Sequence, residues 1–245
     1  MTLFVLFGRY CLLLYQALRS FIEIKTYKKN FIQELIKTGY DSIPIILLVG
    51  AFTGAVLSIQ TAYQLSSGLI PTSTIGAIVS RSVIIELGMG IGGLVLAGRI
   101  GARIATELGY MRVSEQIDAL ESMGFNSVSF LVIPRVLAGI ISFPILYLIV
   151  AATGVLGGLI SGHLTGAVTI SDYMVGARMD FYESDVVFGL IKATVFGFVI
   201  TSISCFKGYF ATGGAEGVGK VTTQAAVLSC VYLLLSDLIL ATILL

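Results

Sequence analysis

The chain has 245 residues, of which 56% are hydrophobic and only 12% are charged, and its mean hydropathy is +0.98. Soluble domains carry about 25% charged residues, so this composition excludes an ordinary water-soluble protein. The formal net charge of +1 gives no concentrated basic surface of the kind that binds nucleic acid, and we expect no nucleic-acid partner.

Residues 1–40 predict an N-terminal region that rests on a membrane. The polar residues within 2–27 recur at helical spacing and share one stripe of a helix: Thr2, Arg9, Gln16, Ser20 and Glu23. Basic residues follow this apolar segment closely. We therefore expect an interfacial amphipathic helix on the cytoplasmic leaflet, and a first transmembrane span with a stray arginine is the alternative.

Five apolar runs follow in a membrane domain that covers residues 41–245. A helix needs about 20 apolar residues to cross a bilayer. The runs cover approximately residues 43–65, 74–98, 131–160, 186–206 and 222–245. The predicted fold class is an all-α membrane protein with one interfacial helix and about five transmembrane helices.

Lysine and arginine residues predict the orientation of these helices, because cytoplasmic loops carry an excess of both. Basic residues gather before the first span, around residues 99–135 and in the loop at 207–220, whereas Arg178 is the only one between spans three and four. We expect the three basic regions and the N-terminus in the cytoplasm. An odd number of spans then places the C-terminus outside.

Glycines at four-residue steps predict close contacts between helices. Gly50 and Gly54 form such a step in the first span, and Gly154 and Gly158 form another in the third. Small residues at this spacing let helix backbones approach closely in lipid. The glycines indicate tight packing and suggest a dimer face, although glycine is in any case frequent in membrane helices.

The segment 105–124 between spans two and three is too charged for the hydrocarbon of a bilayer. It carries Glu107, Arg112, Glu115, Asp118 and Glu121, while its apolar residues recur at helical spacing. Arg112 and Glu115 are spaced as an i,i+3 pair that supports a short exposed helix. Such a helix lies on the lipid surface or docks to a partner, and a solvated loop is the alternative.

Four charged residues fall inside the predicted spans. Arg81 and Glu86 lie in span two, Lys192 in span four and Asp237 in span five. Charged side chains inside a membrane are costly and face protein or water. We expect Glu86, Lys192 and Asp237 to line a polar cavity or to pair with one another. The alternative is a buried ion pair whose only role is to fix the register of the helices.

Three apparent catalytic or nucleotide-binding motifs do not hold up, and we expect no catalytic residue, no metal site and no cofactor bound by this chain. Gly214 to Lys220 nearly matches a phosphate-binding loop, but Val221 occupies the position of the required hydroxyl and no strand precedes it. The glycine pattern at 88–93 lies inside an apolar span. Ser161 and His163 would point in different directions on a helix, which argues against a nucleophile and its base and favours a polar residue at the outer water boundary.

One long stretch resembles a known family. It contains E-L-G at 86–88, L-A-G-R-x-G-A at 96–102, the charged run at 105–124, and Pro134-Arg135 with Ala138-Gly139. Downstream follow Arg178-Met-Asp180, Lys192, Lys207-Gly-Tyr209 and Val221-Thr-Thr223. These motifs are similar to those of the MlaE/YrbE family of ABC-transporter permeases over roughly residues 40–245. The chain differs at Ile85 and Met89, where relatives commonly have arginine and proline.

The resemblance implies a homodimeric permease that moves phospholipid between an inner membrane and the extracytoplasmic side. It implies separate cytoplasmic ATPase subunits that bind ATP and magnesium, an MCE-domain subunit outside, and a STAS-domain subunit as a further candidate partner. It maps a coupling helix onto about 105–123 and a lipid cavity onto the dimer interface. A bacterial inner membrane and a plastid inner envelope are both compatible with this resemblance.

The alternative function is a secondary transporter or channel that uses Glu86 or Asp237, although the five spans show no convincing internal repeat.

Overall fold

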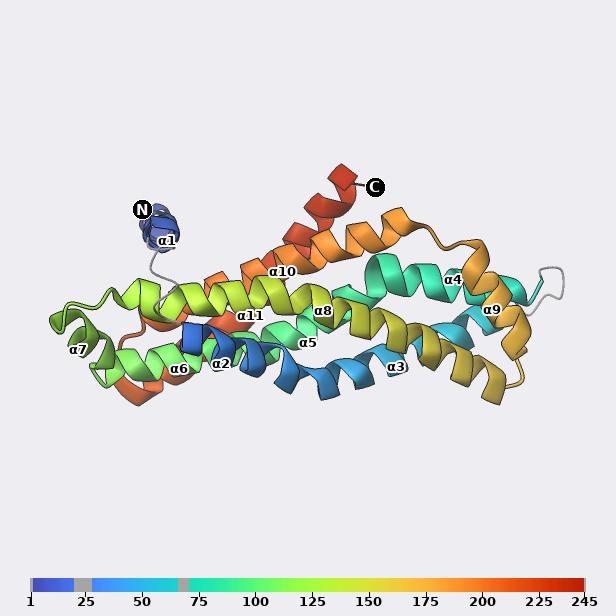
Figure 1. Cartoon of the computed structure of the whole chain (residues 1–245), viewed down its shortest axis with the longest axis horizontal. Coiled ribbons are helices and arrows are strands. Elements are labelled where there is room, and N and C mark those ends of the chain that lie inside the picture. Colours follow the sequence, from blue (N-terminus) through green and yellow to red (C-terminus); the bar gives the residue numbers. More distant parts are fainter. Residues whose placement is uncertain (1, 20–27, 66–70, 245) are drawn as a thin grey trace. The chain divides into compact units, whose positions relative to one another are not determined.

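The computed structural model of the chain describes residues 2–19, 28–65 and 71–244. Within these ranges all regular structure is helical and no strand occurs, which confirms the predicted all-α class (Figure 1). Among the described residues, five helical runs are long and apolar enough to cross a membrane, which is the predicted number: Lys28–Gln64, Ser73–Val113, Ser127–Leu164, Glu183–Tyr209 and Gly214–Leu244. The first run begins well before residue 43, and the second extends beyond the predicted end at 98. The chain is therefore a multi-pass membrane protein.

The chain divides into two compact units, and each is described by itself. The first unit comprises the described parts of Met1–Tyr40 together with Leu94–Ser142 and Val195–Ser236. The second unit comprises the described parts of Asp41–Gly93, Phe143–Thr194 and Asp237–Leu245.

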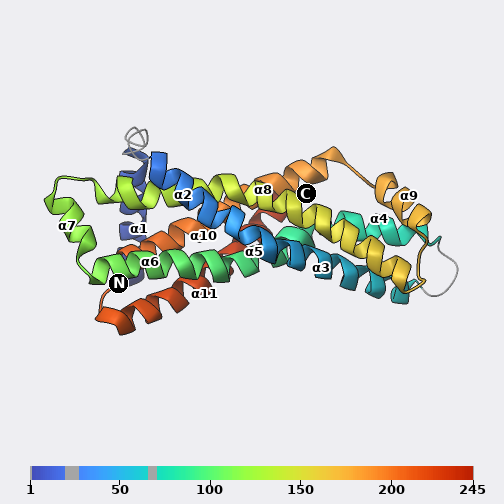
Figure 2. The ribbon, with the colours of Figure 1, turned by 60° about the horizontal axis from the view of Figure 1, so that its bottom comes forward.

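The first unit begins with the two N-terminal helices. Its complete helices are α1 (Thr2–Arg19), α2 (Lys28–Thr38), α6 (Ala102–Val113) and α7 (Gln116–Ser122). It also contains the beginning of α8 (Ser127–Leu164), the end of α10 (Glu183–Tyr209) and most of α11 (Gly214–Leu244). Both views of the ribbon place α7 between the end of α6 and the beginning of α8 (Figures 1 and 2).

Of the segment 2–27, which was predicted to form an interfacial helix, residues 2–19 are described and form α1. Tyr10 anchors this helix to α10, because its hydroxyl lies 2.9 Å from that of Ser202 and its ring meets the ring of Phe206 edge-on. Leu13 is buried on the same helix, whereas Arg9 is exposed. Ser20 and Glu23, which belong to the predicted polar stripe, lie outside the described residues. The interfacial location stays a prediction.

The second unit contains α3 (Ile43–Gln64), α4 (Ser73–Ser82), α9 (Ile170–Met179) and most of α5 (Gly88–Leu96). It also contains the end of α8, the beginning of α10 and the described last residues of α11. The helices α4 and α9 lie side by side in both views (Figures 1 and 2). Gly76 and Gly176 allow this approach, since a Cβ on Gly76 would meet the carbonyl of Tyr173 and one on Gly176 would meet that of Ser73. Tyr173 is buried within the apolar core of this unit.

The second membrane-spanning run is not a uniform α-helix. Two π-helical turns interrupt it: η3 (Val83–Leu87) before α5, and η4 (Ala97–Gly101) before α6. A π turn holds one extra residue, and it changes the direction of the residues beside it. The amide of Gly88 donates to the carbonyl of Val83, and a Cβ on Gly88 would lie only 2.6 Å from that oxygen. A glycine at position 88 therefore permits the irregular turn.

The charged segment 105–124 is two helices, so the expectation of one helix is wrong. Helix α6 ends at Val113, and Glu115 adopts a left-handed conformation with φ 58° before α7 begins. The backbone amide and the hydroxyl of Ser114 both donate to the carbonyl of Tyr110, over 2.9 and 2.7 Å, at the end of this helix. The sequence pattern missed the break because apolar residues on both sides keep the same helical spacing.

Candidate functional site

Three of the predicted intramembrane charges meet in the second unit. Lys192 on α10 lies 2.8 Å from Oε2 of Glu86 on η3 and 2.5 Å from Oδ1 of Asp237 on α11. The Lys192 side chain is fully buried, whereas 45% of the Glu86 side chain is exposed. The sequence-based expectation that these charges pair with one another therefore describes the structure.

The environment of Lys192 explains why it carries two acidic partners. A buried ammonium group without a counter-charge would be strongly unfavourable, and opposite charges within hydrogen-bonding distance compensate it. The face of the Phe188 ring lies 5.6 Å from the Lys192 nitrogen and adds a weaker attraction. Because Glu86 has the most exposed side chain of the triad, it is the member that a ligand reaches most easily.

A hollow of about 560 Å³ lies beside Glu86 in the second unit. Its wall combines apolar side chains with a few charged ones: Ala77, Ile78, Arg81, Ser82, Ile85, Glu86, Leu87 and Asp180. Arg81 lies on this hollow but does not join the triad. Its guanidinium instead pairs with Asp185 at 3.4 Å and lies 5.2 Å from the centre of the Tyr182 ring.

A second ionic cluster lies in the first unit and joins three helices. Arg135 on α8 lies 3.3 Å from Glu34 on α2 and 3.3 Å from Glu107 on α6. Arg103 on α6 reaches the same two carboxylates at 3.4 and 3.5 Å. Lys37 adds a contact of 3.4 Å to Glu107. The side chains of Glu34 and Arg135 are nearly buried, whereas Lys37, Arg103 and Glu107 are partly exposed. The cluster therefore holds α2, α6 and α8 together around a nearly buried ion pair.

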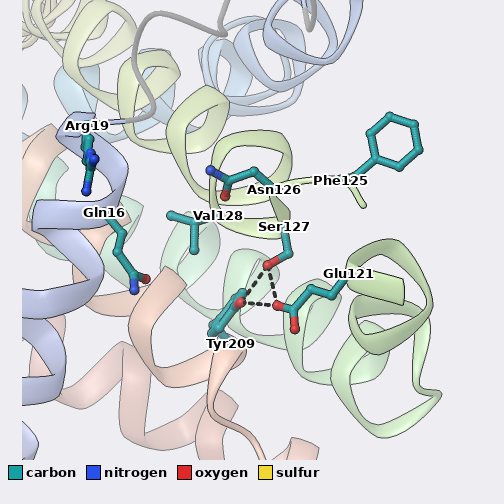
Figure 3. A pocket seen from close by; sticks show the side chains of 8 residues that line it. All are labelled: Gln16, Arg19, Glu121, Phe125, Asn126, Ser127, Val128 and Tyr209. Carbon is teal, nitrogen blue, oxygen red and sulfur yellow. Dashed lines mark hydrogen bonds between the residues drawn. The ribbon is translucent and has the colours of Figure 1, made fainter. Parts of the chain in front are cut away.

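Glu121 on α7 also makes internal contacts, which Figure 3 shows. The hydroxyls of Ser127 and Tyr209 both donate to its Oε1, over 2.7 and 3.0 Å, and they lie 2.7 Å from each other (Figure 3). The hydrogen bond from Ser127 holds the pKa of the Glu121 carboxyl below its usual value. This carboxylate therefore attaches α7 to the beginning of α8 and the end of α10.

The five charged residues predicted for partner docking separate into two groups. Glu107 and Glu121 are engaged within the first unit, as described above. Arg112 pairs with Asp118 at 2.7 Å and not with Glu115, so the predicted i,i+3 pair is wrong. Glu115 and Asp118 are exposed, while Ile117 is fully buried and anchors α7. The exposed charge of this segment is therefore concentrated at the break and on α7.

The four glycines predicted for helix packing lie in the contact between α3 and α8 of one chain. A Cβ on Gly54 would meet the backbone of Gly154, and a Cβ on Gly50 would meet the side chain of Thr153. Gly158 approaches the hydroxyl of Tyr173 and the side chain of Val79. Because this intrachain contact occupies the glycines, they are not the dimer face that their spacing suggested.

Sequence reasoning missed Glu34, Arg103 and Arg135 as interacting residues. The i,i+4 spacing of Arg103 and Glu107 could have revealed one pair. Nothing in the sequence links Glu34 to Arg135, since about a hundred residues separate them and only the folded helices bring them together. Within residues 2–19, 28–65 and 71–244, no three His, Cys, Asp or Glu side chains are grouped as a metal site would require.

Comparison with known proteins identifies the family. The family described as "Permease MlaE" matches residues 31–243. A probable ABC transporter permease protein of Rickettsia bellii is 40% identical over 230 residues, which cover 94% of this chain and 88% of that protein. The protein TRIGALACTOSYLDIACYLGLYCEROL 1, chloroplastic, of Arabidopsis thaliana is 34% identical and covers 93% of this chain and 65% of its own length. The intermembrane phospholipid transport system permease protein MlaE of Haemophilus influenzae is 32% identical, with 96% of this chain and 90% of that protein covered.

Proposed function

Because the chain belongs to the MlaE permease family, we propose that it is the membrane subunit of an ABC-type lipid transporter. It moves phospholipid between the inner membrane and the extracytoplasmic side, and a separate cytoplasmic subunit binds ATP with magnesium and hydrolyses it. The name of the Haemophilus influenzae relative, which refers to intermembrane phospholipid transport, supports this substrate class.

The hollow beside Glu86 is the observation that carries the lipid assignment. Its wall is mostly apolar, and Arg81, Glu86 and Asp180 add charge to it. A phospholipid combines apolar acyl chains with a charged headgroup, so this combination suits a lipid better than a hydrated ion or a sugar. Lys192 keeps Glu86 in place from the protein side and leaves part of the carboxylate open to the headgroup.

Coupling to the ATPase is assigned to α7 and the break before it. Closure of the ATPase on nucleotide displaces α7, and α6 continues through η4, α5 and η3 as one helical run, Ser73–Val113. Glu86 lies on η3, so a displacement that enters at α6 can reach the hollow along a single helix. The π turns are the points at which this helix changes most easily.

The proposed assembly contains two copies of this chain, the ATPase, an MCE-domain subunit and a STAS-domain subunit. The chain lies in the inner membrane with its N-terminus in the cytoplasm and its C-terminus outside, and a plastid inner envelope is the equivalent location. The grouping of basic residues before the first span and around 99–135 supports this orientation.

Transport by the purified complex in proteoliposomes tests the function. We expect transfer of labelled phospholipid to require both ATP and the ATPase, and Glu86→Gln to reduce it at least tenfold. Glu183→Gln, at an exposed position at the beginning of α10, is the matched control and leaves the rate unchanged. Transfer by this chain alone, without ATPase or nucleotide, would refute the proposal.

The buried triad also favours an alternative, an ion- or proton-coupled carrier that uses Glu86 or Asp237. Carboxylates inside membranes commonly mark proton or ion pathways, and a lysine between them can exchange partners. A pH gradient imposed on the same vesicles without ATP separates the two functions. Proton flux into the vesicles that Asp237→Asn abolishes supports the carrier. Lipid transfer that requires ATP and does not change with the pH gradient supports the permease.

A further inference from the structure

A basic cavity of about 330 Å³ lies in the first unit and shares no residue with the hollow at Glu86. Each of three helices contributes one cation to its wall: Arg9 on α1, Lys207 on α10 and Lys220 on α11. Lys220 comes from the glycine-rich stretch that resembles a phosphate-binding loop but lacks the loop's hydroxyl and strand.

Specific packing brings these cations together. Tyr10 follows Arg9 in the chain, and its contacts with Ser202 and Phe206 fix α1 against the end of α10 beside Lys207. After Tyr209 the chain turns through Gly213, at φ 95°, and Gly214, at φ 66°, and α11 begins. Gly217 lines the cavity, and the turn approaches it so closely that a Cβ there would meet the carbonyl of Thr212. The turn therefore returns Lys220 to the same wall.

The charge of the basic cavity is not balanced by acidic side chains. Among the residues that the structure describes, none of the three cations forms an ion pair with a carboxylate, and Lys207 donates only a long hydrogen bond of 3.4 Å to the amide oxygen of Gln224. The cluster around Arg135 differs, since carboxylates compensate its cations. Like charges that line one cavity repel one another, and an anionic ligand would relieve this repulsion.

The rest of the wall indicates which anion fits. Phe206 and Phe210 stack edge-on beside the cations, and 40% of Phe210 is exposed. Thr212 adds a hydroxyl that can donate to an oxyanion. Phosphate attached to an apolar tail satisfies both surfaces, whereas a free phosphate uses only the cations. We propose that the basic cavity binds the phosphate headgroup of an anionic phospholipid, with the acyl chain against the two phenylalanines.

This site is independent of the transport proposal. Native mass spectrometry of the full-length chain in detergent, titrated with phosphatidylglycerol or with phosphatidylcholine, tests it. We expect phosphatidylglycerol to bind at least tenfold more tightly. The triple variant Arg9→Gln, Lys207→Gln and Lys220→Gln should lose this preference, because each removed cation weakens attraction to anionic lipid about fivefold. The charge-preserving variant Lys207→Arg with Lys220→Arg should retain it.

The matched control removes the same number of charges elsewhere. Lys28, Lys29 and Arg178 are exposed and lie outside the basic cavity, so changing all three to glutamine should leave lipid preference unchanged. Equal losses in the control would show a general charge effect and overturn the site. Inorganic phosphate or ATP that displaces the lipid at millimolar concentration would reassign the cavity to a soluble phosphate and overturn the lipid assignment. Lipid transfer is measured separately, so failure here leaves the transport proposal untouched.

Discussion

Lys192 shows how a single buried residue can decide both stability and activity. Its ammonium balances two carboxylates, and 13% of the Asp237 side chain is exposed, so little water can replace the lysine there. Removing one partner of a buried ionic group leaves the others uncompensated, which costs about 3–5 kcal/mol in soluble proteins. The stability of this chain therefore depends on the balance of charge within the triad and not on the lysine alone.

We predict that Lys192→Met lowers the thermal unfolding midpoint of the detergent-solubilised chain by at least about 5 °C, following the cost of an unbalanced buried charge. The triple variant Lys192→Met, Asp237→Asn, Glu86→Gln removes the imbalance and should recover most of the midpoint. Lipid transfer should stay low in both variants, because Lys192 no longer holds the Glu86 carboxylate in the single variant and that carboxylate is absent from the triple variant. Equal midpoints in the single and triple variants would contradict this account.

Glu121 gives the first unit a dependence on pH. Its pKa in the folded chain is lowered, chiefly by the hydrogen bond from Ser127, so the stabilisation is complete above the pKa of an unfolded glutamate. It is lost as the pH falls through the lowered value. We predict that Glu121→Gln lowers the unfolding midpoint at pH 7 and that the difference from the unmodified chain narrows below about pH 4. Glu115→Gln, at an exposed position, should show no such narrowing.

Helix packing in the second unit depends on the absence of side chains. Helix α3 approaches α8 so closely at Gly54 that even a methyl group would strike the backbone of Gly154, which cannot move independently of its helix. The contact is one of backbone surfaces, which is how membrane helices gain packing energy without a hydrophobic driving force. This explains why small residues recur on both helices at the same four-residue step.

We predict that Gly54→Ala destabilises the chain by about 1–3 kcal/mol, the usual cost of overpacking, because α3 and α8 must separate. Gly90→Ala is the matched control in the same unit, since nothing lies within 4 Å of a Cβ built there. Alanine favours a helix over glycine, so the control should be neutral or slightly stabilising. The yield of monodisperse protein and the unfolding midpoint are measured for both variants. A Gly54 variant as stable as the control would show that the two helices pack more loosely than described.

The sequence predicts the helices of this molecule better than it predicts the contacts between them. The five membrane-spanning runs were predictable because each exceeds the length that a bilayer requires and few charges interrupt it. The meeting of Glu86, Lys192 and Asp237 was also predictable, since uncompensated charges in a membrane must find partners. The break at Glu115 was not, because a left-handed residue in a charged segment leaves the helical pattern intact on both sides. The contact of Glu34 with Arg135 depends on tertiary packing, which no local pattern records.

The charges at the break and on α7 can serve two roles in the assembly, contact within the chain and contact with the ATPase. Asp118 holds Arg112 within the chain, whereas Glu115 is exposed and has no ion pair among the described residues. If the ATPase recognises this segment by charge, Glu115→Arg should weaken its association about two- to fivefold without changing the unfolding midpoint of the chain. Glu183→Arg is the control and should change neither quantity.

The exchanged pair Arg112→Asp with Asp118→Arg completes the test. It restores an internal ion pair with the two charges interchanged, so the fold of α7 should survive, whereas Asp118→Arg alone places two arginines together. If α7 contributes only to the stability of the first unit, the exchanged pair restores both ATPase binding and ATP-driven lipid transfer. If α7 is the docking surface, the fold recovers but binding does not, because the partner now meets the wrong charge at each position. Pull-down of the ATPase by the full-length variants, beside their unfolding midpoints, distinguishes the two outcomes.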